Sequence, residues 1–143
     1  MGTKKPFELK RIDHIGIAVR KIEEHLDFYR DVLHMEYLGE KVVSSQKVRV
    51  AMFKIGESVI ELLEPTNPDS PISNFLVKRG EGIHHLCYDV DDIHTALAEL
   101  SNKGISLINE KPVIGAKGVK ISFLHPKSTK GILVELSESQ SSS

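Results

Sequence analysis

The sequence predicts an α+β fold in which two βαβββ modules pair to form one curved mixed sheet. Two observations carry this prediction. Strand-like runs with period-two alternation are followed by amphipathic helical segments, first near residues 13–33 and again near residues 84–103. The two halves also align with each other at an offset of 71 residues. The chain therefore contains one internal repeat.

The strands of the two modules correspond in order. The run Asp-His-Ile-Gly-Ile-Ala-Val at 13–19 aligns with His-His-Leu-Cys-Tyr-Asp-Val at 84–90. Three extra residues in the second module fit in the loop 125–131. Later strands also align, 48–53 with 119–124 at the offset of 71, and 59–63 with 133–136 at an offset of 74.

Each first strand is followed by a segment with apolar residues at helical spacing. We expect one helix over 22–33 and another over 92–103, which Gly104 ends. A short helix is expected in the linker, beginning after Asp69-Ser70-Pro71. The apolar faces of the two longer helices are formed by Ile22, Leu26, Tyr29 and Leu33, and by Ile93, Ala96, Leu97 and Leu100.

The pattern also predicts how the chain is organised. Neither half-sheet can bury its apolar face alone, so each must pack against the other or against another chain. The predicted parts are an N-terminal extension at 1–10, a first module at 11–65, a linker with a short helix at 66–79, a second module at 80–138 and a disordered tail at 139–143.

Composition is that of an ordinary globular protein, with 40% apolar and 27% charged residues in 143. The formal net charge of −1 is spread along the chain, which argues against nucleic acid or a membrane as a partner. The single cysteine, Cys87, leaves no intramolecular disulfide and suits a reducing compartment. With no apolar run of signal-peptide type, we expect a cytoplasmic protein, or one of an organelle matrix in a mature eukaryotic form.

Two histidines and two glutamates occupy matching places in the repeat. His14 aligns with His85, and Glu61 aligns with Glu135. Because strand side chains alternate between faces, each of the four lies opposite an apolar set that can pack under a helix. The four side chains are therefore expected on the other, concave face.

Imidazole nitrogens and carboxylate oxygens together suit a divalent ion such as Zn²⁺, Co²⁺, Ni²⁺ or Mn²⁺. An octahedral ion held by four protein ligands keeps two positions for a chelating substrate, as in a catalytic metal site. By contrast, His84 is expected to be a packed, hydrogen-bonded neighbour, and His125 to shape its loop. Cys87 is expected to be a small buried thiol that faces the site.

Several stretches between about residues 11 and 136, nearly the whole chain, carry a family resemblance. The most specific are Gly-Glu-Gly-Ile-His-His at 80–85 and His-Pro-Lys at 125–127. The others are Ile-Asp-His-Ile-Gly-Ile-Ala-Val at 12–19, Ile-Glu-Leu-Leu-Glu-Pro at 60–65, Asp-Ser-Pro-Ile at 69–72, Phe-Leu-His-Pro-Lys at 123–127 and Gly-Ile-Leu-Val-Glu-Leu at 131–136. In these stretches the chain resembles the vicinal oxygen chelate superfamily, and within it the methylmalonyl-CoA epimerase family.

The resemblance implies a glyoxalase-like sheet around a divalent metal ion held by His14, Glu61, His85 and Glu135. It also implies an isomerase that interconverts (2R)- and (2S)-methylmalonyl-CoA. In this reaction the α-proton is abstracted through a metal-stabilised enolate, and Glu135 serves as an acid/base group. The implied partners are an acyl-CoA thioester substrate and a second copy of the chain. We expect a homodimer with each site inside one chain.

One position departs from the family pattern. Inversion needs two acid/base groups, and the family's second is a glutamate at the position of Val50. Valine cannot transfer a proton. The alternatives are Gln46 or Glu40 holding a water, Ser122 and Lys127. Lysines suited to the CoA phosphates are Lys117, Lys120, Lys127 and Lys130.

Two other functions are alternatives within the same superfamily. One is a glyoxalase-type lyase acting on a glutathione hemithioacetal with the same ligand types. The other is a non-catalytic small-molecule-binding member of the superfamily, in which the ligand positions are normally lost. Here all four remain.

Overall fold

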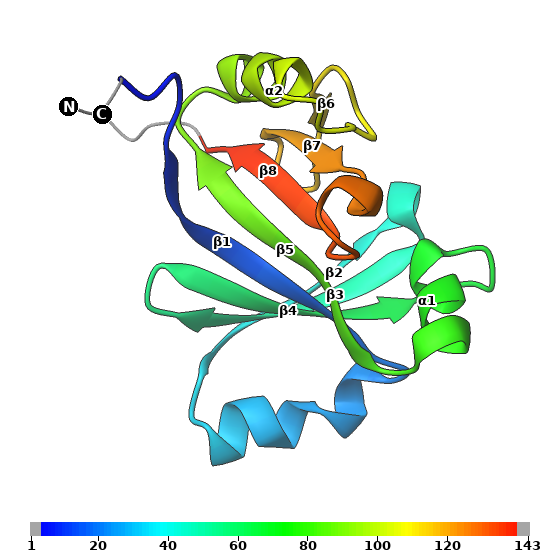
Figure 1. Ribbon diagram of the computed structural model, residues 1–143. Coiled ribbons are helices and arrows are strands. Elements are labelled where there is room, and N and C mark those ends of the chain that lie inside the picture. Colours follow the sequence, from blue (N-terminus) through cyan, green and yellow to red (C-terminus); the bar gives the residue numbers. More distant parts are fainter. Residues whose placement is uncertain (1–3, 140–143) are drawn as a thin grey trace. The chain divides into compact units, whose positions relative to one another are not determined.

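A computed structural model describes residues 4–139 (Figure 1). The contacts divide the chain into two compact units. One unit is formed by His14–His85, and the other combines the segment that ends at Asp13 with the segment that begins at Leu86. The strands β1 (Leu9–Ala18) and β5 (Gly82–Val90) contribute residues to both units. The first three residues and most of the predicted tail at 139–143 lie outside the described residues.

In the unit 14–85, four strands follow the order β2-β3-β4-β1. The strands β2 (Glu36–Val43), β3 (Val48–Ile55) and β4 (Ser58–Pro65) are consecutive in the chain. β2 pairs antiparallel with β3, and β3 pairs antiparallel with β4. β4 then pairs parallel with β1, and this register places Glu61 opposite Gly16. A parallel pair needs a crossover connection, so this is the strand arrangement that a βαβββ module requires.

The second unit repeats this arrangement with the order β5-β8-β7-β6. Its strands are β6 (Val113–Ile114), β7 (Lys120–Leu124) and β8 (Val134–Glu138), which pair antiparallel in sequence. β8 pairs parallel with β5. The expected repeat of one parallel and two antiparallel pairings is therefore present in both halves of the chain.

The first predicted helix differs from expectation. Instead of one α-helix over 22–33, the chain forms a 3-10 turn, η1 (Ile22–Glu24), and then a π-helix, η2 (Asp27–Val32). The amide of Leu33 donates to the carbonyl of Phe28, five residues back. A 3-10 turn is tighter and a π-helix is wider than an α-helix, so neither keeps the 3.6-residue period. Leu33, predicted on the apolar face, is consequently 48% exposed.

The other two helices agree with the sequence pattern. α1 (Pro71–Arg79) begins after Ser70, whose side chain accepts a hydrogen bond from the amide of Ile72. α2 (Ile93–Asn102) begins after Asp92, which accepts from the amide of Thr95. Both caps satisfy amides that a helix start leaves without an intrahelical partner. The two remaining short turns are η3 (Ser44–Gln46) and η4 (Pro126–Ser128).

The apolar cores confirm the predicted strand faces. In the unit 14–85, Val19 and Leu62 pack with Ile22 of η1, on the face opposite His14 and Glu61. In the other unit, Val90 of β5 and Leu136 of β8 pack under α2. Figure 1 shows this helix lying beside the two strands. A third cluster lies on the same face as His14, where α1 covers Ala18, Val48, Val50 and Leu63.

Within residues 4–139, no helix has the length and apolar character needed to cross a membrane.

Candidate metal centre

His14 and His85 converge in the interior of the unit 14–85. His14 belongs to β1 and His85 to β5, and their side chains are buried, with 7% and 8% of the residue exposed. Their Nε2 atoms lie 3.0 Å apart and their rings meet edge-on, at 87°. Two imidazole nitrogens from distant parts of the sequence therefore face one point.

Glu61 joins the pair from β4. Its Oε1 lies 3.7 Å from the Nε2 of His14. The parallel register with β1 explains this approach, because Glu61 stands opposite Gly16, two residues from His14 on the same strand face. Three of the four predicted ligands thus lie together within one unit.

Gly16 makes room for His85. A Cβ built on Gly16 would lie 2.3 Å from Cε1, 2.6 Å from Nδ1 and 2.9 Å from Nε2 of His85. The imidazole ring therefore rests directly on the glycine backbone, and any larger residue would displace it. Sequence reasoning missed this role, although a glycine inside a strand is a known sign of such a close approach.

His85 is held in its neutral form. Burial, followed by the neighbouring His14 and His84, lowers the pKa of His85 to about 3. Removing an imidazolium from water costs free energy, and two nearby imidazoles increase that cost. The neutral ring retains a nitrogen lone pair, which is the form that binds a metal ion.

His84 lies on the other side of the His85 ring. The Nδ1 atoms of the two residues are 2.9 Å apart, and the His84 ring meets the edge of Phe75 of α1 with centroids 5.1 Å apart. Burial lowers the pKa of His84 as well. The expectation that His84 is a packed, hydrogen-bonded neighbour is confirmed.

Glu135 belongs to the other unit. It lies on β8 and is 6% exposed. Its strand neighbours Val134 and Leu136 pack into the core under α2, so the Glu135 side chain points to the opposite face, as its parity predicts. Its register partners are Cys87 on β5 and Phe123 on β7.

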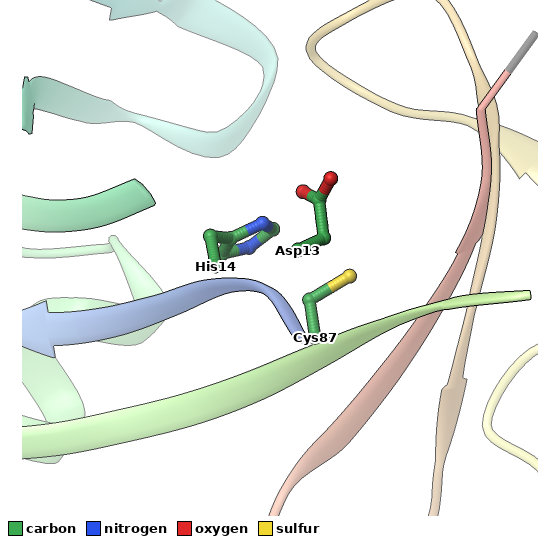
Figure 2. A group of neighbouring side chains, drawn as sticks. All are labelled: Asp13, His14 and Cys87. Atoms are coloured by element: carbon green, nitrogen blue, oxygen red, sulfur yellow. The ribbon is translucent and has the colours of Figure 1, made fainter. Parts of the chain in front are cut away.

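Figure 2 shows Asp13 and His14, which are consecutive in β1, together with Cys87 of β5. Within their shared unit, a carboxylate oxygen of Asp13 and the Sγ of Cys87 lie within 4.8 Å. Asp13 also forms ion pairs with Lys117 at 3.2 Å and Arg11 at 3.4 Å. The buried Cys87 thiol is 3.4 Å from the hydroxyl of Ser137, in keeping with the expected buried thiol.

Val50 is buried in apolar surroundings, with 5% of the residue exposed and with Ala18, Leu63 and Leu76 in its cluster. The environment at this position therefore suits a hydrocarbon side chain.

The side chains considered as alternatives to the missing glutamate differ in burial and in hydrogen-bond partners. Ser122 is fully buried and donates to the carbonyl of Asn109 at 2.6 Å, and Glu40 pairs with Tyr37 and Arg49.

The loop and surface candidates occupy exposed positions. Gln46 lies in η3, and Lys127 lies in η4. His125 shapes this second turn, as expected, because its Nδ1 accepts a hydrogen bond from the amide of Lys127. Of the other lysines proposed for phosphate, Lys117 pairs with Asp13, Lys120 is 3.2 Å from the Nε2 of His94, and Lys130 is exposed.

The donor set of the unit 14–85 fits a divalent ion. Nitrogens that ligate at about 2.1 Å lie about 3.0 Å apart in an octahedral site and about 3.4 Å apart in a tetrahedral one. The observed 3.0 Å between the two Nε2 atoms fits an octahedral pair. The carboxylate oxygen at 3.7 Å lies slightly beyond both values. Imidazole nitrogens and a carboxylate oxygen are also the ligand types that such ions prefer.

Comparison with known proteins identifies the family. The family model of the Glyoxalase/Bleomycin resistance protein/Dioxygenase superfamily matches residues 13–123. The mitochondrial methylmalonyl-CoA epimerase of Bos taurus is 39% identical over 139 residues, which cover 96% of this chain and 79% of that protein. The chain belongs to this superfamily and, within it, to the methylmalonyl-CoA epimerase family.

Solved structures agree with this assignment. A methylmalonyl-CoA epimerase in complex with methylmalonyl-CoA and NH4+ matches with a TM-score of 0.86 and 39% identity, over 94% of this chain and 97% of that one. A hypothetical protein from Bacillus halodurans matches with a TM-score of 0.89 and 45% identity, over 97% and 99%. The predicted glyoxalase-like α+β fold is confirmed, and the family is one of isomerases.

Replacing Gly16 should test the packing beneath His85. Gly16→Ala places a methyl group where the His85 ring lies, so His85 must move and the affinity for Co²⁺ should fall about 10- to 100-fold. Isothermal titration calorimetry measures this affinity. Gly82→Ala is the matched control, since a Cβ there meets nothing within 4 Å. Unchanged Co²⁺ affinity in Gly16→Ala would contradict the assigned contact.

The lowered pKa of His85 predicts acid sensitivity in chelator-treated protein. Between pH 6.5 and about 3 the unfolded chain binds a proton at His85 that the folded chain does not, so stability falls as the pH falls. Replacing His85 with Asn removes this difference. Between pH 7 and pH 5, His85→Asn should therefore lose about 2 kcal/mol less unfolding free energy than the wild-type chain loses. Urea unfolding measures it.

The wild-type protein, unfolded under the same conditions, is the reference. If His85→Asn lost as much unfolding free energy as the wild-type chain between pH 7 and pH 5, His85 would not be the group that titrates in this range.

Proposed function

We propose that the chain interconverts (2R)- and (2S)-methylmalonyl-CoA by removing and returning the α-proton. The observation that carries this proposal is the convergence of the buried His14 and His85 with the partly buried Glu61. Family membership supports it, since relatives that align with most of this chain are named methylmalonyl-CoA epimerase. The substrate of the relative with bound methylmalonyl-CoA supports an acyl-CoA thioester here.

The proposed metal ligands are His14, Glu61, His85 and Glu135. Glu135 is included because it is buried, repeats the position of Glu61 and points away from the core under α2. A divalent ion bound there, such as Co²⁺, Ni²⁺, Mn²⁺ or Zn²⁺, supplies positive charge beside the oxygen on which negative charge develops. The protein's part is to hold the imidazoles and carboxylates in place and to exclude water.

Glu135 is also the proposed acid/base group for one face of the substrate carbon. A carboxylate can take the α-proton that lies between a thioester carbonyl and a carboxylate, because the negative charge left behind spreads onto oxygen. Inversion requires proton delivery to the opposite face. Val50 cannot supply that proton, and its surroundings are apolar. The opposite face therefore depends on another side chain or on water.

Proton exchange in heavy water tests this function. Each stereoisomer of methylmalonyl-CoA is incubated with Co²⁺-loaded protein, and deuterium at the α-carbon is followed by NMR. The wild-type chain should exchange and epimerise both isomers. His85→Ala should lose about 100-fold or more of this rate and most of the bound metal. Glu135→Gln should lose about 100-fold or more of the exchange while retaining part of the metal.

His94→Ala, at an exposed site on α2, is the control and should keep wild-type rates. A wild-type chain that left methylmalonyl-CoA unchanged but isomerised a glutathione hemithioacetal would instead have the lyase activity. Stoichiometric metal in His85→Ala would reject the ligand assignment, and equal exchange from both isomers in Glu135→Gln would reject Glu135 as the base.

We also propose that the chain forms a homodimer, with each site inside one chain, in the cytoplasm or an organelle matrix. Exposed apolar side chains gather on η2 and on Leu33, the residue that follows it. Phe28, Val32 and Leu33 are 52%, 62% and 48% exposed. β2 stands at the end of the strand order and offers an edge. Exposed apolar groups and open strand edges are typical of surfaces that bind another chain.

Sedimentation equilibrium at micromolar concentration should give about twice the chain mass of 16.0 kDa. Val32→Lys should shift the protein toward monomer, because it introduces a charge into the proposed interface. Val77→Lys, at an even more exposed apolar position on α1, should remain dimeric. A monomeric wild-type protein would contradict the assembly.

A further inference from the structure

His84 occupies a partly buried position between α1 and the metal centre. One side of its ring meets Phe75, and the other meets His85, whose ring lies at 90° to it with centroids 5.2 Å apart. The guanidinium of Arg79 lies 5.8 Å from the centroid of the Phe75 ring. The imidazole of His84 is therefore held by packing against α1 while it reaches the ligand next to it in sequence.

The polar contact within this arrangement is specific. The Nδ1 atoms of His84 and His85 are 2.9 Å apart, the usual length of a hydrogen bond between nitrogens. Only one of the two atoms can carry the shared proton. The opposite nitrogen of His85, Nε2, is the atom that faces His14.

These contacts select one tautomer of His85. If its Nδ1 carries the proton and donates to His84, its Nε2 keeps a lone pair directed at His14 and the ion position. The Nδ1 of His84 must then accept, which places the proton of His84 on its own Nε2. Histidines that ligate metals commonly donate their second N–H to a neighbouring acceptor, which fixes both tautomer and ring orientation.

We propose that His84 is a positioning residue for the metal ligand His85, acting through the Nδ1–Nδ1 hydrogen bond. This role rests on the proposed metal-dependent function. Phe75 and α1 hold the acceptor, His84 fixes the donor, and Gly16 supports the ring of His85 from below. His84 itself does not touch the ion or the substrate.

Two substitutions separate the hydrogen bond from the packing. His84→Phe keeps a ring against Phe75 but removes the acceptor. His84→Asn places an amide oxygen near the position of Nδ1 and so keeps an acceptor. The dissociation constant of Co²⁺, measured by chelator competition, should rise about 10- to 100-fold in His84→Phe and only a few-fold in His84→Asn.

Nitrogen-15 NMR of the histidine rings in chelator-treated protein gives a readout that is independent of metal binding and activity. In the wild-type chain His85 should carry its proton on Nδ1, and His84 on Nε2. In His84→Phe, the ring of His85 should become a mixture of tautomers. His94→Phe, the same change at an exposed histidine, should alter neither the tautomer of His85 nor the Co²⁺ affinity.

The outcomes distinguish this proposal from the proposed function. Wild-type affinity in a folded His84→Phe, or a His85 proton found on Nε2, would overturn the role of His84 and leave the metal centre intact. A wild-type chain without Co²⁺ affinity would overturn both. Urea unfolding of each variant confirms that the protein under test is folded.

Discussion

The structure depends on the meeting of two buried imidazoles. A polar group taken out of water must find a partner, and His14 and His85 do so through their Nε2 atoms. The surrounding elements make this meeting possible. The strand face shared with Gly16 leaves space for one ring, and the β4 register brings Glu61 to the other. Within the unit 14–85, an apolar cluster packs against the opposite face of β1 and β4.

Much of this arrangement follows from local patterns in the sequence. Period-two alternation fixes which face each side chain occupies, so it predicted that His14 and Glu61 oppose the residues under η1. The repeat then extended the same argument to the second half of the chain. α1 and α2 were predictable for a similar local reason, because Ser70 and Asp92 cap their first turns.

What the sequence did not reveal depends on contacts between distant segments. The π-helical turns of η2 rotate Leu33 outward, although its spacing matched an α-helix. The packing of α1 against Val50 was not expected, because strand parity does not say which element will cover a face. The hydrogen bond of His84 to its neighbour also requires α1 to hold the His84 ring in place.

The space above Gly16 links two positions that are far apart in the sequence. Only a residue without a side chain leaves room for the ring of His85, so neither position can change freely while the other stays. Related chains that keep the imidazole should therefore also keep the glycine. A relative with a larger residue at this place in the first strand has lost the geometry of the pair, even where its sequence still shows the histidine.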